Sequence, residues 1–312
     1  MSRRLFSTPS YKPQFSGHET FPLRQLWLRK AFDAVQLYGP RAPRGVFSDQ
    51  EAIALFGVGK NMVGAIRHWG LACDIIREVA GAYEVTELGE LLFGDDGLDP
   101  YLEHPASAWL AHWQLAGEGR RSTTWYWLFN HVGSASFDRK TLANDLIAYC
   151  TEAKISKMSP NTIKRDVECC VRSYVPSSGA EAAEDITEPV LGDLGLLTHS
   201  RGAEFDFRFG AKPTLPDGIF LYALTRFWDT FAHGANTLSL DTVCYERGSP
   251  GMVFKIDIDS VAERLIDAQR SSDGVFAWAE TAGLRQVIRK KEKIDPLVFL
   301  PQAYGQRRRR SQ

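Results

Sequence analysis

The first informative stretch of the chain is residues 15–24, which read FSGHETFPLR. Thr20 is a residue type that caps helices, and Pro22 suits a first helical turn, where a missing backbone N–H has no consequence. Apolar residues then recur at helical spacing over residues 23–35, which predicts a helix with one apolar stripe. The stretch therefore indicates a loop that leads directly into a helix.

His18 and Glu19 would lie at the amino end of this helix. Free backbone N–H groups and the positive end of the helix dipole meet there, so the position suits a phosphate group. Arg24 lies mostly off the apolar stripe and is a candidate to neutralise negative charge. The alternative is that His18 and Glu19 only cap the helix and bridge the loop, because short motifs are weakly specific.

A helix, a tight turn, a second helix and a hairpin are predicted next. Residues 48–56 begin with a capping box, and residues 60–71 predict the second helix. Residues 75–79 and 82–85 predict two strands joined by a short turn. This order is typical of a winged helix-turn-helix, which places its second helix in the DNA major groove. The alternative is that a domain with this fold contacts only other proteins.

A comparable layout recurs further along the chain. Residues 142–150 predict one helix, and Ser159-Pro160 is a typical start for another. A hairpin with its turn at Arg201-Gly202 follows. These elements predict a second winged-helix-like module, and two such modules would grip neighbouring turns of a duplex.

The candidate DNA contacts lie on the polar faces of two helices, the one over residues 60–71 and the one that starts at Ser159-Pro160. Further candidates lie in a basic arm at the end of the chain. Residues 285–312 contain nine Lys and Arg residues and two acids, although the net charge of the chain is −1. Such an arm suits a polyanion, and a solvated tail is the alternative. The candidates are Lys60, Asn61, Arg67, Lys164, Arg165, Arg307, Arg308, Arg309 and Arg310.

An acidic loop is the candidate metal site. Asp95, Asp96 and Asp99 lie on a glycine-broken segment and Glu103 follows four residues later. Carboxylates in such a loop can converge on a small divalent cation, although the spacing differs from that of an EF-hand. An acidic turn that caps a helix starting near Pro105 is the alternative.

Composition excludes several classes of protein. The chain has 312 residues, of which 44% are hydrophobic and 12% aromatic, as in a packed globular protein. We find neither a membrane-spanning run nor a signal segment, and five cysteines do not make a disulfide framework, so we expect reduced thiols in the cytoplasm. Walker, dinucleotide, zinc-pair and serine-elbow motifs are also missing.

The predicted fold class is mainly α with small β-hairpins (α+β), with two winged-helix-like modules and a helical remainder. In the last third we expect a helix over 220–231, a strand over 253–259 and further helices from Val261 and over 276–288. The expected segments are 1–95 (N-terminal helix and winged-helix module), 96–136 (Trp-rich helical segment with the acidic loop), 137–212 (second module), 213–304 (helical segment with a hairpin) and 305–312 (basic disordered tail).

Four blocks of sequence resemble a known family. They are FSGHETF at 15–21, DGLDPYLE at 96–103, WLAHWQL at 109–115 and TIKRD at 162–166. These blocks are similar to those of an uncharacterised-domain family found in DNA phosphorothioation gene clusters. The resemblance extends from about residue 15 to residue 304.

The resemblance implies a cytoplasmic bacterial protein of an anti-phage system that nicks one strand of double-stranded DNA, so that sulfur can replace a non-bridging phosphate oxygen. It further implies a divalent ion, Mg²⁺ above all. The implied partners are a cysteine desulfurase, an ATP-pyrophosphatase-like sulfur transferase and an ATPase.

The leading hypothesis is metal-assisted hydrolysis of one strand by a winged-helix protein. The acidic loop would hold the metal, His18 or Glu19 would serve as general base, and Arg24 would neutralise developing phosphate charge. The first alternative is a non-enzymatic winged-helix adaptor or regulator that recruits the sulfur-modification machinery. The second is a protein-interaction scaffold that does not bind DNA. A homodimer would double the footprint on DNA.

Overall fold

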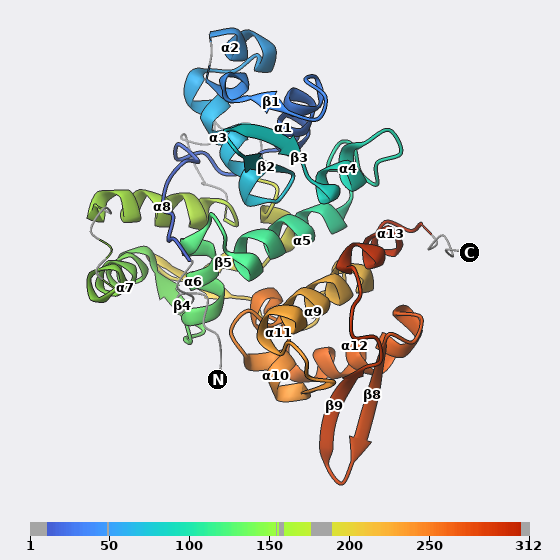
Figure 1. Ribbon diagram of the computed structural model, residues 1–312. Coiled ribbons are helices and arrows are strands. Elements are labelled where there is room, and N and C mark those ends of the chain that lie inside the picture. Colours follow the sequence, from blue (N-terminus) through green and yellow to red (C-terminus); the bar gives the residue numbers. More distant parts are fainter. Residues whose placement is uncertain (1–10, 49, 154, 156–158, 176–188, 307–312) are drawn as a thin grey trace.

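The computed structural model describes residues 11–48, 50–153, 155, 159–175 and 189–306. It confirms an α+β fold in which helices are interspersed with three small antiparallel sheets (Figure 1). The five cysteines are buried free thiols, as expected. Over the described residues, every helix is too short or too polar to cross a membrane.

The first unit, near the top of Figure 1, has two strands that form a hairpin after its third helix. Ala80 and Gly81 join these strands with positive φ angles of 48° and 81°, which suits a two-residue hairpin turn. The sheet order is β1-β3-β2. The elements are α1 (Trp27–Gln36), β1 (Ala42–Pro43), α2 (Gln50–Phe56), α3 (Lys60–Ala72), β2 (Ile76–Val79) and β3 (Ala82–Val85).

The second unit has the same order of elements, and its sheet order, β4-β6-β5, is also equivalent. Ser159 caps its third helix by accepting a hydrogen bond from the Thr162 N–H at 3.1 Å, as the sequence predicts. The elements are α6 (Thr123–His131), β4 (Ser136–Asp138), α7 (Arg139–Glu152), α8 (Pro160–Arg172), β5 (Leu197–His199) and β6 (Glu204–Phe207).

A third unit, which the sequence did not reveal, repeats this order once more with one extra short helix. Its sheet order is β7-β9-β8, and the hairpin of β8 and β9 projects from the body of the protein (Figure 1). The elements are α9 (Asp217–Phe231), β7 (Thr237–Ser239), α10 (Leu240–Tyr245), α11 (Pro250–Phe254), α12 (Ile258–Ser271), β8 (Phe276–Thr281) and β9 (Leu284–Arg289).

Two predictions for this third unit are wrong. The expected strand over 253–259 is instead the junction of two helices, because Ser249 caps α11 and Asp257 caps α12 through the Ser260 N–H at 2.9 Å. The expected helix over 276–288 is instead the hairpin. Its turn residues Ala282 and Gly283 have positive φ angles of 51° and 80°.

A buried helix connects the units. Every residue of α5 from Ala106 to Trp113 is buried, and α5 crosses the middle of the molecule between the first and third units (Figure 1). A π-helical turn follows directly, and such turns are frequent at functional sites. The remaining elements are α4 (Glu87–Phe93), α5 (Pro105–Trp113), the π turn (Gln114–Glu118), α13 (Leu300–Ala303) and the 3-10 turns Arg44–Phe47, Gly192–Leu194 and Pro296–Phe299.

Lys255 joins the second and third units through a buried amine. Its side chain is 1% exposed, and its Nζ donates a hydrogen bond to the carbonyl oxygen of Phe129 at 2.8 Å. The same nitrogen lies 4.4 Å from the centre of the Phe207 ring. Burial lowers the pKa of Lys255 to about 7.

Because the pKa of Lys255 is lowered in the folded protein, we predict that the free energy of unfolding depends on pH. An unfolded lysine has a pKa of about 10.4, so unfolding takes up a proton between about pH 7 and 10, and the folded state gains stability as the pH rises. The free energy of unfolding of the wild type, relative to Lys255→Met, should therefore rise by up to about 1.4 kcal/mol per pH unit over this window. Denaturant titrations at several pH values measure it, with the exposed Lys290→Met as control. If the free energies of unfolding of the wild type and of Lys255→Met changed in parallel with pH, the lowered pKa of Lys255 would be contradicted.

Candidate functional site

The segment before the first helix does not form the helix start that the sequence predicted. Glu19 and Thr20 have positive φ angles of 50° and 65°, and the Phe21 N–H donates to the His18 carbonyl oxygen at 2.9 Å to close a tight turn. Helix α1 begins only at Trp27. Thr20 is therefore not a helix cap. Consecutive left-handed residues other than glycine are strained, and such strain is concentrated at functional sites.

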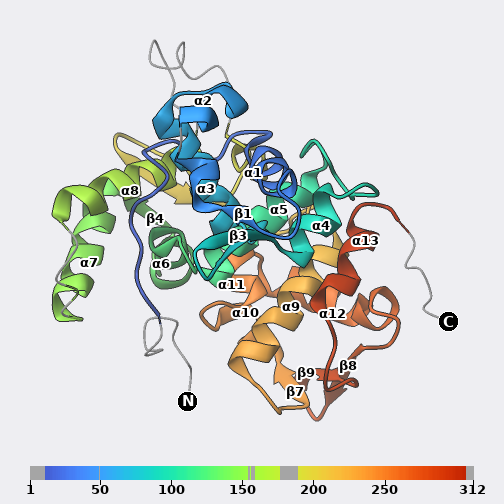
Figure 2. The ribbon, with the colours of Figure 1, turned by 45° about the horizontal axis from the view of Figure 1, so that its top comes forward.

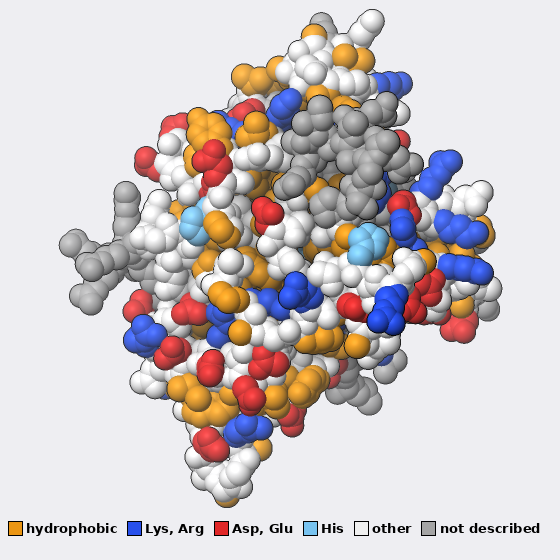
Figure 3. All heavy atoms as spheres, turned by 180° about the vertical axis from the view of Figure 1, so that it is seen from behind, with side chains coloured by type: hydrophobic (Ala, Val, Ile, Leu, Met, Phe, Trp, Pro, Cys, Tyr) orange, Lys and Arg blue, Asp and Glu red, His pale blue; other side chains and the backbone are white. Residues whose placement is uncertain are grey.

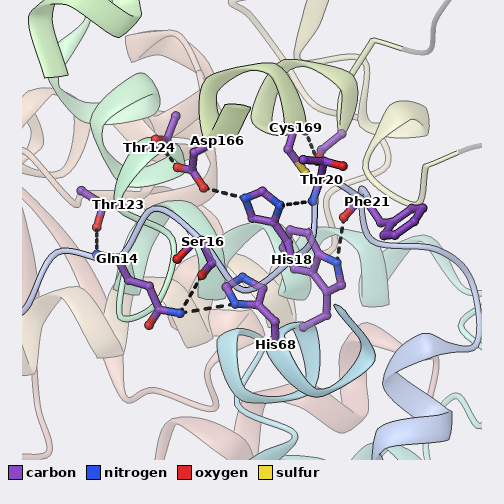
Figure 4. Close-up of polar contacts among 12 residues, drawn as sticks. Gln14, Ser16, His18, Thr20, Phe21, His68, Thr123, Thr124, Asp166 and Cys169 are labelled. Atoms are coloured by element: carbon purple, nitrogen blue, oxygen red, sulfur yellow. Dashed lines mark hydrogen bonds and ion pairs between the residues drawn. The ribbon is translucent and has the colours of Figure 1, made fainter. Parts of the chain in front are cut away.

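His18 is held from both sides of its ring and is only 3% exposed (Figure 4). The Thr20 N–H donates to Nδ1 at 3.0 Å, so this nitrogen carries no proton. Nε2 therefore carries the proton and donates to Asp166 Oδ1 at 2.6 Å. The second carboxylate oxygen of Asp166 accepts the hydroxyl of Thr124. His18 is thus a neutral imidazole whose two nitrogens are both engaged.

The turn that contains His18 lies between α3 and α8, which are neighbours in both ribbon views (Figures 1, 2 and 4). The His18 ring stacks on Trp69 of α3 with centroids 6.0 Å apart, while Asp166 belongs to α8. The Trp69 indole N–H also donates to the carbonyl oxygen of Phe21 at 3.1 Å. One short segment therefore connects the third helix of the first unit to that of the second.

Close packing against α3 requires a glycine at position 17. Gly17 has a φ of 113°, and a Cβ there would lie 2.7 Å from Nδ1 of His68. His68 is buried on α3, and this burial lowers its pKa well below the ordinary value. His68 is therefore neutral and serves packing, with Gln14 at 3.5 Å from its Nδ1.

Glu19 is exposed at the tip of the turn, beside the outer face of α3. A Cβ on Gly64 would be in ordinary contact, 3.6 Å from the Cγ of Glu19. Lys60, Asn61 and Arg67 are exposed on the same helix. The structure therefore brings Glu19 together with the candidate DNA contacts of the first unit.

The candidate contacts of the second unit, Lys164 and Arg165, are exposed on α8. Neither they nor Lys60 and Arg67 form an ion pair with any residue in the described ranges. Figure 3 shows Lys and Arg side chains gathered over α7 and α8, among some acidic ones. We call the exposed faces of α3 and α8, with Glu19 between them, the α3–α8 surface.

The small sheet of the first unit and the residues beside its β1 strand differ from α3, because their arginines form ion pairs with the glutamates of the sheet. Arg41 and Arg77 both bind Glu84, at 2.9 and 3.0 Å, and Arg44 binds Glu78. Their hydrogen bonds to Glu84 lower the pKa of its carboxyl. Among the described residues of this unit, the cations without an ion pair therefore include those of α3, whereas the arginines at the sheet are paired.

The acidic loop is not a preformed metal site. Asp99 is buried, and its carboxylate accepts the backbone N–H groups of Glu103 and His104, each at 3.0 Å, and the Ser107 hydroxyl at 2.5 Å. Asp95, Asp96 and Glu103 are exposed. In the part of the chain that the structure describes, no three His, Cys, Asp or Glu side chains are arranged to hold a metal ion.

Arg24 lies half-buried over two aromatic rings, 5.5 Å from the centre of Phe21 and 5.4 Å from that of Trp27. It belongs to the same stretch as Glu19, on the side of α1. Arg307, Arg308, Arg309 and Arg310 lie outside the described residues.

Sequence reasoning missed Asp166 and Thr124. Asp166 is three residues after Ile163 and one before Val167, both of which are buried on the apolar stripe of α8. A carboxylate in such a stripe needs a buried partner. The position of Asp166 in this stripe indicated that it has a buried partner. Nothing in the sequence identified that partner as His18, which is 148 residues away.

The fold and the site define an α+β protein of three similar units, the first two joined by a buried histidine–aspartate contact. A family model described as a protein of unknown function (DUF4007) matches residues 15–304, so the chain belongs to this family. No curated protein matches the chain.

Two solved structures are similar over nearly the whole chain. The magnesium ion-bound SspB crystal structure is 28% identical, with a TM-score of 0.85 over 98% of this chain and 91% of that chain. The SspB crystal structure is also 28% identical, with a TM-score of 0.84 over 97% of this chain and 90% of that chain. The resemblance found in the sequence is thereby confirmed.

We predict that removal of the contact between His18 and Asp166 strongly destabilises the fold. Asp166→Ala leaves the His18 Nε2–H and the Thr124 hydroxyl buried without an acceptor, so unfolding should become easier by about 2–4 kcal/mol. Urea denaturation measures this change. Asp145→Ala, at an exposed position on neighbouring α7, should stay within about 0.5 kcal/mol of wild type. Equal stabilities of the two variants would show that the contact does not hold the units together.

Proposed function

We propose that this protein binds duplex DNA through the α3–α8 surface and nicks one strand with the help of Mg²⁺, as part of a DNA phosphorothioation system. The likeness to SspB, including its magnesium ion-bound form, supports the system and the metal. The proposal for DNA binding rests on exposed cations of two neighbouring helices, Lys60, Arg67, Lys164 and Arg165, which form no ion pair with the residues that the structure describes.

In this proposal the three units are winged helices with different tasks. Helices α3 and α8 occupy the position of the DNA-reading helix in their units. The equivalent helix of the third unit, α12, exposes Asp259, Glu263 and Asp267. Carboxylates repel phosphates, so the third unit is not expected to contact the duplex.

Glu19 is the carboxylate we assign to the chemistry. Mg²⁺ is commonly bound by one or two carboxylates together with substrate phosphates, so a single exposed carboxylate beside a DNA-binding helix is compatible with it. When bound, the metal would polarise a phosphoryl oxygen and assist the attacking water. His18 positions Glu19 through the tight turn and, with both nitrogens engaged, does not act as the base. Arg24 is the candidate to neutralise developing phosphate charge.

A non-enzymatic DNA-binding adaptor is the second candidate function. The observation that favours it is the lack of three clustered metal ligands within the described ranges. An adaptor would need the α3–α8 surface but neither Glu19 nor magnesium.

Relaxation of supercoiled plasmid tests the proposal. With Mg²⁺, the wild type should convert the plasmid to the nicked form and EDTA should stop it. Glu19→Gln should lower the nicking rate by about a hundredfold or more, since it removes the proposed metal ligand without changing the size of the side chain. Duplex binding, measured by gel retardation, should remain.

The acidic loop provides the matched control. Asp95→Asn/Asp96→Asn should nick at the wild-type rate, because these side chains lie outside the α3–α8 surface. If this variant alone lost nicking activity, the metal would be assigned to the acidic loop and not to Glu19. If the purified wild type binds duplex DNA but leaves the plasmid supercoiled, the adaptor is correct.

A further inference from the structure

A pocket on another part of the molecule has no role in the proposed nicking. It lies where the π turn, α6, the end of α9 and the loop between α10 and α11 meet, and its volume is about 720 Å³. It shares no lining residue with the α3–α8 surface. Among its aromatic lining residues, Phe231 is half-buried, whereas Trp113, Tyr126 and Phe227 are only 1%, 4% and 4% exposed.

The pocket also contains more positive charge than its acids neutralise. Arg226 and Glu118 form a two-bond ion pair, at 2.7 and 2.9 Å, so their charges cancel. Burial alone would raise the pKa of Glu118, but the hydrogen bond and charge of Arg226 outweigh it and hold this pKa below the ordinary value. Asp229 is engaged by Arg289.

Two arginines remain available to a ligand. Arg120 is 57% exposed, and its nearest carboxylate contacts, with Glu118 and Asp74, are long at 3.6 and 3.8 Å. The guanidinium of Arg247 is half-buried and forms no ion pair with the residues that the structure describes. Both line the pocket.

Arg247 is held in place by the backbone next to it. The Gly248 N–H donates to Oδ1 of the buried Asn130 at 2.7 Å. The Nδ2 of Asn130 donates to the carbonyl oxygens of Ala116 and Tyr126, at 2.8 and 2.9 Å. One buried amide thus fixes the loop that carries Arg247 against the π turn and α6. Such preorganisation reduces the entropy lost when a ligand binds.

An accessible aromatic ring, here that of Phe231, and arginines together suit a nucleotide. Stacking on aromatic side chains is favourable for every base, and arginine is the side chain that matches phosphate geometry. We propose that this pocket binds a nucleoside monophosphate unit, with its base against the ring of Phe231 and its phosphate on Arg247 and Arg120. The unit is either a free nucleotide or one nucleotide of a single strand. Only the second source rests on the proposed nicking.

Binding of defined probes to the full chain tests this inference. Calorimetry with dAMP and with inorganic phosphate, and anisotropy with a labelled twelve-nucleotide oligo(dT), distinguish the ligand and its source. We expect dAMP or the oligonucleotide to bind more tightly than phosphate. Arg247→Gln should weaken that binding about tenfold or more, because it removes a charge-assisted contact. The matched control is Arg270→Gln on α12, an exposed arginine that does not line the pocket.

Three results would overturn the inference. They are no binding of either nucleotide probe at millimolar concentration, equal binding by wild type and Arg247→Gln, or inorganic phosphate that binds as tightly as dAMP. Thermal unfolding of each variant shows that the fold is retained. Plasmid nicking, measured on the same samples, separates the two proposals, because dAMP binding without nicking would retain the pocket while excluding the enzyme.

Discussion

The hydrogen bond between His18 and Asp166 connects the segment before the first unit to α8 of the second unit. A buried carboxylate must be satisfied, and among the described residues Asp166 accepts hydrogen bonds from the His18 ring and the hydroxyl of Thr124. This requirement fixes the turn between α3 and α8. This turn places Glu19 on the outside, beside the exposed residues of α3. A structural contact in the interior therefore defines the arrangement of the surface.

The three units show how one order of elements can carry different surfaces. The helices α3 and α8 expose cations that form no ion pair within the described part of the chain, whereas α12 exposes carboxylates. The pocket that contains Arg247 lies elsewhere, where the third unit meets the π turn and α6. Binding of a duplex and binding of a single nucleotide would thus be assigned to separate parts of the chain.

Local features of the sequence predicted α3, α8 and the first two hairpins, because glycine, proline and capping residues mark their ends. The third unit was missed for a local reason as well. Caps at Ser249 and Asp257 produce two helices whose junction alternates like a strand. Contacts between distant residues left no such signal, so neither the partner of His18 nor the three donors that occupy Asp99 could be predicted.

The salt dependence of duplex binding tests the central claim, that α3 and α8 hold one duplex together. Fluorescence anisotropy would compare the wild type with Lys60→Ala/Arg67→Ala, Lys164→Ala/Arg165→Ala and the combined variant. If each cation contacts a phosphate, each pair of substitutions lowers the logarithmic salt slope by about 1.8, and the combined variant lowers it by about 3.6. An unchanged slope in either pair would contradict the account.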